Sequence, residues 1–216
     1  MESAHFFAMI HRMRYIRRWS LMRNTETENI EEHSLQVAVI AHALAEIRRL
    51  PGFEERPAVD NADVLLLAIY HDASEILTGD LPTPVKYFNP RIREAYQAVE
   101  SVAIQRLLNM LPEPLRPAWS AAMSPDLSDP GLREAAILVK AADKLTAYIK
   151  CIEEKKAGNT EFLQAEAATQ ALVEQLAAEL PEVRYFVDHF LPSYWLSLDE
   201  LQSDGSNDQP LPQEPT

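Results

Sequence analysis

The amino-acid sequence predicts an all-α protein, a helical bundle of about seven helices. Only 5 of its 216 residues are glycine, and alanine, leucine, glutamate and arginine, which favour helices, recur throughout. The 15 prolines fall in clusters, so they separate helices instead of interrupting them. Between these clusters the apolar residues recur at helical spacing. A glycine-rich β architecture is therefore disfavoured.

The helical period places the first elements of the chain. Residues 3–17 carry an apolar stripe and are expected to form a helix, whereas residues 19–28 lose the period and are expected to form a loop. Asn29 is suited to be the N-cap of a second helix, because acidic residues follow it in the first turn. This helix is expected to run to about Leu50, before a Pro-Gly pair.

A third helix is expected from Asp60 or Asn61 to about residue 79, and because it is apolar on most sides we expect it to be central. The next segments are a loop over 80–90 that contains three prolines, and irregular chain over 112–129 with at most a helical turn. The remaining helices are expected over residues 91–111, 131–156 and 160–179 and after Pro181.

The chain length is suited to one domain with a sizeable core. We expect this domain over residues 1–202. From residue 203 to 216 the sequence is polar, contains proline and has no period, so we expect a disordered tail there.

The charge and cysteine content limit the partners and the compartment. A formal net charge of −13 argues against a nucleic-acid polymer as partner, since that partner needs concentrated lysine and arginine. No apolar run approaches the roughly 20 residues that span a bilayer, and the N-terminus has no apolar signal segment. The single cysteine, Cys151, is typical of a reducing compartment. We therefore expect a soluble cytoplasmic protein without membrane contact.

The adjacent pair His71-Asp72 is the first candidate for chemistry. It lies late in the third predicted helix, which is otherwise apolar, and an unpaired aspartate buried there would cost several kcal/mol. A cation is a natural partner, because carboxylate and imidazole are both good ligands for first-row metals. Glu75 lies four residues after His71 and so shares its helix face, within reach of water at such an ion.

His33 in the second helix and Asp143 in the fifth extend this candidate site, and ligands from three helices would hold one ion between them. Other readings of the spacing stay open. A lone helical histidine is more often solvated or hydrogen-bonded, Asp143 could pair with a neighbouring lysine, and His71-Asp72 could be a simple hydrogen-bonded couple. Spacing alone does not decide between them.

Longer motifs add a resemblance. The H…HD…D signature of the HD-domain phosphohydrolase superfamily is matched, in order, by His33, His71-Asp72 and Asp143. Residues 17–23, 32–38 and 71–88 are similar to segments of the bacterial 5′-deoxynucleotidases of the YfbR type. The resemblance extends from about residue 3 to residue 201, and it implies the HD-domain helical bundle.

The resemblance implies a role for each matching residue. One divalent metal ion, Co²⁺ or Mn²⁺ before others, would be bound by His33, His71, Asp72 and Asp143. The implied catalytic residues are Glu75, which helps to activate water, Arg18 and Asp72. The implied substrate contacts come from Arg18, Trp19, Asp72, Asp80, Leu81, Pro82, Thr83 and Asp143.

The implied reaction is hydrolysis of deoxyribonucleoside 5′-monophosphates to deoxynucleosides and phosphate by a homodimeric enzyme. A guanidinium such as that of Arg18 can donate hydrogen bonds to two phosphate oxygens at once. The indole plane of Trp19 can stack on the face of any base. The loop at Asp80 would favour deoxyribose by pairing with its 3′-hydroxyl and excluding a 2′-hydroxyl. Two alternatives remain: an HD-type phosphohydrolase acting on a triphosphate, cyclic dinucleotide or guanosine tetraphosphate, and a nucleotide-binding module without turnover.

Overall fold

The protein is all-helical, as predicted. The computed structural model describes residues 4–53, 56–86 and 88–203, and these residues contain helices and loops but no β-strand. The tail predicted over residues 203–216 lies outside this described part, apart from Ser203. None of the helices within the described ranges is both long and apolar enough to cross a membrane.

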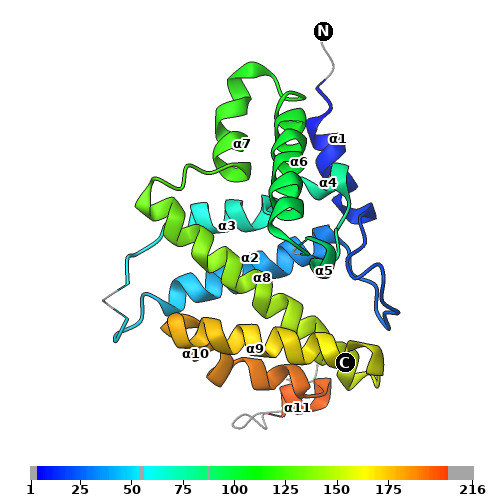
Figure 1. Cartoon of the computed structure of the whole chain (residues 1–216). Coiled ribbons are helices and arrows are strands. Elements are labelled where there is room, and N and C mark those ends of the chain that lie inside the picture. Colours follow the sequence, from blue (N-terminus) through cyan, green and yellow to red (C-terminus); the bar gives the residue numbers. More distant parts are fainter. Residues whose placement is uncertain (1–3, 54–55, 87, 204–216) are drawn as a thin grey trace, which may run out of the picture.

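Three helices form the centre of the bundle. α2 (Ile30–Ile47), α3 (Asn61–Tyr70) and α8 (Pro130–Lys156) pack against one another, and α8 runs diagonally through the molecule (Figure 1). α9 (Leu163–Glu179) and α10 (Pro181–His189) cover one side of this centre. The main core lies between these helices and is made of small and branched apolar side chains such as Ala41, Leu44, Ala68, Leu138 and Leu145.

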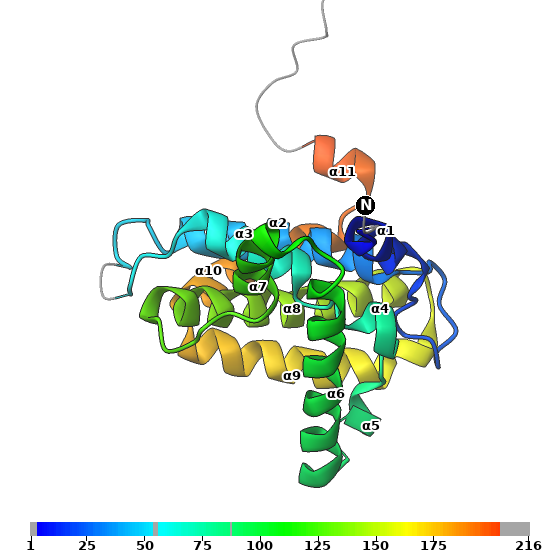
Figure 2. The same cartoon turned by 90° about the horizontal axis from the view of Figure 1, so that it is seen from above.

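A second, smaller core lies at the other end of the bundle. It is built by α1 (Phe6–Ile10), the 3₁₀ segment His11–Tyr15, α4 (Glu75–Thr78), α6 (Pro90–Leu108) and α7 (Arg116–Met123). Phe6 and Leu107 are fully buried in it. α6 projects away from the body, with the one-turn helix α5 (Thr83–Lys86) beside it (Figure 2).

Short segments complete the fold. The 3₁₀ turns are Glu113–Leu115, Thr160–Phe162 and Leu191–Trp195, and the last helix is α11, Leu198–Gln202. The predicted N-cap of α2 is confirmed, because the Asn29 side chain accepts hydrogen bonds from the backbone N–H groups of Glu31 and Glu32. In return, the Glu32 carboxylate accepts a hydrogen bond from the backbone N–H of Asn29. Asp60 is confirmed as the cap of α3 through the N–H of Ala62.

Three predicted elements are corrected by the structure. The single helix expected over 3–17 is a short α-helix followed by a 3₁₀ turn that ends at Tyr15. The helix expected over 60–79 stops at Tyr70, and a turn separates it from α4. The segment 112–129 contains the helix α7 and a 3₁₀ turn, where only a helical turn was expected. A fourth difference is the one-turn helix α5, which lies inside the loop expected over 80–90.

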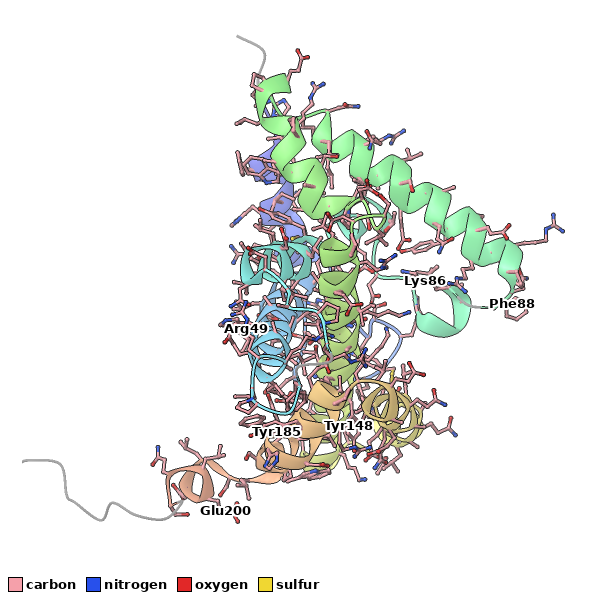
Figure 3. The ribbon with its side chains drawn as sticks, turned by 90° about the vertical axis from the view of Figure 1, so that its left-hand side faces the viewer. Arg49, Lys86, Phe88, Tyr148, Tyr185 and Glu200 are labelled. Atoms are coloured by element: carbon pink, nitrogen blue, oxygen red, sulfur yellow. The ribbon has the colours of Figure 1, made fainter. Side chains whose placement is uncertain are left out.

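A buried ion network joins three of the helices. Arg48, at the end of α2, donates to Glu182 of α10 through Nε (3.0 Å) and Nη2 and to Glu134 of α8 through Nη1 (2.9 Å). The side chains of Arg48 and Glu182 are 1% and 0% exposed. The neighbouring Arg49, which follows α2, forms an ion pair with Glu46 and donates to the Val59 carbonyl (2.9 Å), but its side chain is 42% exposed (Figure 3).

We expect Arg48→Met to lower the free energy of unfolding by about 3–5 kcal/mol, because it leaves the buried Glu182 without its counter-charge. Arg49→Met is the matched control and should change it by less than about 1 kcal/mol, as exposed ion pairs contribute little. Urea denaturation followed by circular dichroism measures both. Equal losses for the two variants would contradict the assignment of the buried network.

Candidate metal centre

Four predicted ligand residues come together where α2, α8 and the end of α3 meet. His33 Nε2 lies 3.1 Å from Asp143 Oδ1 and 3.6 Å from Asp72 Oδ2, and His71 Nε2 lies 3.1 Å from the same oxygen of Asp72. One ligand atom each of His33, His71 and Asp143 lies within 4.8 Å of the others. The predicted convergence of three distant segments is therefore seen in the structure.

His71 and Asp72 were expected inside the third helix. The structure instead places both residues in the turn between α3 and α4. His71 Nδ1 is 2.8 Å from the carbonyl oxygen of Ala68, so the imidazole donates to a backbone group at the end of α3. This leaves His71 Nε2 as the free nitrogen, and it is buried without a hydrogen-bond partner. It faces Asp72 Oδ2 at 3.1 Å, and a cation that binds there replaces the proton that Nε2 carries when the imidazole is charged.

The spacing of the cluster also fits a metal ion. Histidine and carboxylate ligands lie about 2.0–2.2 Å from a bound transition metal, so two ligand atoms on one ion are about 3–4 Å apart. The distances of 3.1, 3.6 and 3.1 Å in the cluster fall in this range. Asp143 also accepts from Lys144 Nζ (2.8 Å), but through its other oxygen, Oδ2. The ion pair with a neighbouring lysine and the contact with His33 therefore coexist.

The cluster is strongly coupled electrostatically. Burial disfavours the charged form of His71, but Asp72 and Asp143 outweigh it and raise the pKa of His71 to about 9. Burial disfavours the charged carboxylates too, but His71 lowers the pKa of Asp72 to about 2, and His33 and Lys144 hold the pKa of Asp143 well below its usual value. The carboxylates therefore stay negative and attract positive charge.

Glu75 begins α4 beside this cluster and is 6% exposed. Burial, together with the negative charges of Asp72 and Asp80, raises the pKa of Glu75 to about 9. Its Oε2 atom is buried and has no hydrogen-bond partner. Glu75 thus holds a proton at neutral pH while these carboxylates are unbalanced, and it becomes a base once their charge is neutralised.

Arg18 and Trp19 lie next to the ligand residues. Arg18 Nη1 donates to His33 Nδ1 (2.8 Å) and to Glu28 (2.6 Å), and Nη2 lies 3.9 Å from Asp143 Oδ1. Trp19 has φ 56°, a left-handed conformation that is rare for a bulky residue and costs about 1–3 kcal/mol. Its backbone N–H donates to Asp80 Oδ2 (3.3 Å), which joins the two predicted substrate-contact segments.

The rest of the predicted substrate loop follows Asp80. Leu81 and Pro82 are partly exposed, and the carbonyl of Pro82 accepts the first hydrogen bonds of α5. The side chain of Thr83 lies outside the described part of the structure. Lys86 is turned towards α6, where it pairs with Glu100 (2.8 Å) and lies over the ring of Tyr96 (Figure 3).

Glu28 is a site residue that the sequence pattern did not reveal, because it stands in an aperiodic loop. Its Oε2 atom accepts from Arg18 Nη1 and from the indole Nε1 of Trp19 (3.2 Å). The loop is closed at its base, where the N–H of Arg18 donates to the Glu28 carbonyl (2.9 Å). One carboxylate therefore holds two of the side chains, Arg18 and Trp19, that the resemblance assigns to substrate binding.

The same loop is fastened to the end of α8 by a second unpredicted group. Glu154, whose exposed fraction is 1%, accepts from the backbone N–H groups of Thr25 and Glu26, and Lys150 donates to Glu154 and to the Glu26 carbonyl. Asn159 bridges Glu154 and the Arg23 carbonyl. The i, i+4 spacing of Lys150 and Glu154 on the apolar face of a helix was the signal that could have revealed them.

Comparison with known proteins identifies the family. Residues 5–194 match the model of the YfbR-like 5′-deoxynucleotidase family. The chain belongs to this family. It is 50% identical over 207 residues to the 5′-deoxynucleotidase YfbR of Escherichia coli, covering 94% of this chain and 98% of that protein. It is 49% identical over 206 residues to a 5′-deoxynucleotidase of Enterobacter sp. strain 638, with the same coverage.

Solved structures show the same fold as this YfbR-like chain. An HD-domain phosphohydrolase from Listeria innocua aligns with a TM-score of 0.74 at 22% identity, over 92% of both chains. The HD phosphohydrolase DatZ of cyanophage S-2L, bound to dA and one catalytic Zn²⁺ ion, aligns with a TM-score of 0.56 at 21% identity. This alignment covers 86% of the present chain and 96% of the cyanophage protein. The predicted HD-domain bundle is thereby confirmed.

The anchoring group gives a pH-dependent prediction. Burial alone would raise the pKa of Glu154, but hydrogen bonds from Lys150, Asn159 and Thr25 lower it to about 2. Its contribution to stability is therefore complete above the ordinary pKa of 4.5 and is lost as the pH falls towards 2. We expect Glu154→Gln to lower the free energy of unfolding by about 2–4 kcal/mol at pH 7, and this loss should be smaller by about 1–2 kcal/mol at pH 3.

Urea denaturation at several pH values between 7 and 3 measures this difference. Glu153→Gln, at the neighbouring exposed position, is the control and should have a small effect throughout. A stability difference between Glu154→Gln and the unmodified protein that stays constant from pH 7 to pH 3 would show that the carboxylate does not anchor the loop.

Proposed function

We propose that the cluster around His33 is the active site for the 5′-deoxynucleotidase activity of this YfbR-like chain, in which water hydrolyses deoxyribonucleoside 5′-monophosphates to deoxynucleosides and phosphate. The observation that carries the proposal is the convergence of two histidines and two aspartates with Arg18, Trp19 and Asp80. Ligands for a cation and groups suited to a phosphate and a sugar thus lie in one place.

In this proposal His33, His71, Asp72 and Asp143 hold one divalent metal ion, with Co²⁺ or Mn²⁺ as the expected species. The family relatives and the zinc ion in the cyanophage neighbour support a metal-dependent reaction. When bound, such an ion polarises a phosphate oxygen and lowers the pKa of a bound water towards neutrality. The buried, free Nε2 atom of His71 and the two low-pKa aspartates support the ligand assignment.

Arg18 is the proposed phosphate-binding residue. Its guanidinium points at the cluster and lies 3.9 Å from Asp143, and its side chain is 12% exposed, so its charge acts at low dielectric. A nucleoside monophosphate brings about two negative charges to a chain with a net charge of −13, so a local cation is needed to bind it. Trp19 is proposed to orient the substrate beside Arg18, and Phe162 packs on its ring at 5.4 Å.

Glu75 and Asp72 are the proposed groups for handling protons. Asp72 stays ionised, because its pKa is about 2, and it therefore balances the positive charge of Arg18 and of the proposed cation. Glu75 accepts a proton from the attacking water once a bound cation neutralises the charge of Asp72, because it then loses its own proton while burial still keeps its carboxylate a stronger base than an ordinary glutamate. The residue is held near Asp72 by the first turn of α4.

The loop of Asp80 to Thr83 is proposed to select deoxyribose. Asp80 is fixed by the N–H of Trp19, so its carboxylate is oriented towards the same region as Arg18. A carboxylate there accepts a hydrogen bond from the 3′-hydroxyl of the sugar, and Leu81 and Pro82 fill the space where a 2′-hydroxyl would need a partner. The plane of Trp19 supports broad base tolerance, because every base has a face that can stack.

We further propose a cytoplasmic homodimer. Apolar side chains near the C-terminus remain exposed and support an interface between copies, among them Phe190, Trp195, Leu198 and Leu201. The single free cysteine, Cys151, is buried, and burial raises its pKa to about 11, which suits a thiol that is neither nucleophile nor disulfide. This supports a reducing compartment.

Glu75→Gln and His71→Ala separate the proton-handling role from the ligand role. We expect Glu75→Gln to bind one divalent ion per chain as the unmodified protein does, but to release phosphate from dAMP about 10²–10⁴-fold more slowly. His71→Ala should lose both metal and activity. Metal analysis and a phosphate-release assay with added Co²⁺ or Mn²⁺ measure the two effects. A Glu75→Gln variant with full activity would remove Glu75 from the mechanism.

Asp80→Ala tests the sugar selection. The unmodified protein should hydrolyse dAMP faster than AMP, and the variant should lose about 10–100-fold in kcat/KM for dAMP, since a hydrogen bond to a charged group is worth about 1.5–3 kcal/mol. AMP carries the same 3′-hydroxyl, so kcat/KM for AMP should fall by a similar factor, and the ratio of kcat/KM for dAMP to that for AMP in the unmodified protein tests the exclusion of the 2′-hydroxyl. Asp188→Ala, on the exposed side of α10, is the control and should leave both values unchanged. Equal rates for dAMP and AMP in the unmodified protein would defeat the sugar assignment.

A further inference from the structure

The protonation of His33 follows from its two contacts. Arg18 Nη1 lies 2.8 Å from His33 Nδ1, and a guanidinium only donates hydrogen bonds, so Nδ1 is the acceptor and carries no proton. Asp143 Oδ1, which lies 3.1 Å from Nε2, only accepts. The imidazole is 0% exposed, so no solvent contact changes this arrangement. His33 is therefore held with its proton on Nε2.

This tautomer of His33, with its proton on Nε2, is not the one that binds a metal through Nε2. The nitrogen that faces the cluster, Nε2, must offer a lone pair to a cation, and the proton must then sit on Nδ1. In His71 the proton on Nδ1 already donates to the carbonyl of Ala68, so no exchange between the two ring nitrogens is needed there. His33 must exchange its tautomer: Nε2 loses one proton, Nδ1 gains one, and the net charge of the ring is unchanged.

After that exchange, Nδ1–H and the Arg18 N–H would be two donors facing each other at 2.8 Å, which is unfavourable. A buried N–H needs an acceptor. Glu28 Oε1 lies 3.9 Å from His33 Nδ1, and the side chain of Glu28 is 14% exposed. A shift of about 1 Å brings this oxygen to hydrogen-bond distance. Carboxylates commonly orient metal-binding histidines in this way.

We propose that Glu28 is a positioning residue that accepts the Nδ1 proton of His33 when Nε2 of His33 binds a cation, and that this exchange releases Arg18 from His33. Arg18 keeps its bond to Glu28 Oε2, which also holds the indole of Trp19. The donors freed on Arg18 become available to a phosphate. Cation binding and phosphate binding are thereby linked through one carboxylate, and each favours the other.

The proposal rests on the ligand assignment of the proposed function, so the experiment tests both separately. Zn²⁺ affinity is measured by competition with a chromogenic chelator for the unmodified protein and for Glu28→Gln, Glu26→Gln and His71→Ala. Glu26 is the matched control, since it carries the same charge in the same loop with an exposed side chain. We expect Glu28→Gln to bind Zn²⁺ about 10–100-fold more weakly and Glu26→Gln to bind within about twofold of the unmodified protein.

Nitrogen-15 NMR of histidine-labelled, unmodified protein supplies a readout that does not depend on the variants folding. The His33 ring should carry its proton on Nε2 without Zn²⁺ and on Nδ1 with Zn²⁺. A His33 ring already protonated on Nδ1 without Zn²⁺ would overturn the proposal. So would unchanged Zn²⁺ affinity in a folded Glu28→Gln variant when His71→Ala has lost it. Equal Zn²⁺ affinity in His71→Ala and the unmodified protein would instead overturn the metal site itself.

Discussion

The contact between His33 and Asp143 is the constraint on which the rest of the site depends. It joins α2 to α8 across 110 positions of sequence, with 3.1 Å between Nε2 and Oδ1. Around it the fold concentrates acidic groups: Asp72 and Asp143 are negative, and burial together with the charges of Asp72 and Asp80 raises the pKa of Glu75. Such a cluster is tolerated because the two histidines, Arg18 and Lys144 pair with the aspartates and offset the cost of burying them.

The shape of the loop over residues 17–29 is a second consequence of that centre. Trp19 is held at a positive φ, and such strain persists only where surrounding contacts enforce it. Here the contacts are the Asp80 carboxylate on its backbone, Glu28 on its indole, and Phe162 on its ring. The loop is therefore not a flexible connection but a rigid holder, and the strain places Trp19 beside Arg18 at the edge of the ligand cluster.

The sequence predicted the parts of this protein that depend on local patterns. The apolar period predicted the long central helix, which runs from Pro130 to Lys156, and the capping residues predicted the start of α2 at Asn29. It did not predict that the chain turns at His71, because the turn depends on a bond from the imidazole to Ala68. The ligand cluster was predicted from a motif, whereas Glu28 was missed because no period or motif marks an isolated loop acid.

α8 explains why the metal cluster and the substrate loop keep a fixed distance from each other. Asp143, Lys150 and Glu154 follow at intervals of seven and four residues, so they lie along one face of a single helix. Asp143 contacts His33, while Lys150 and Glu154 hold the backbone around Thr25 and Glu26. A rigid helix therefore supports both halves of the site. A displacement of the loop relative to the ligands therefore requires the bonds of the buried Glu154 and Lys150 to the loop backbone to break first.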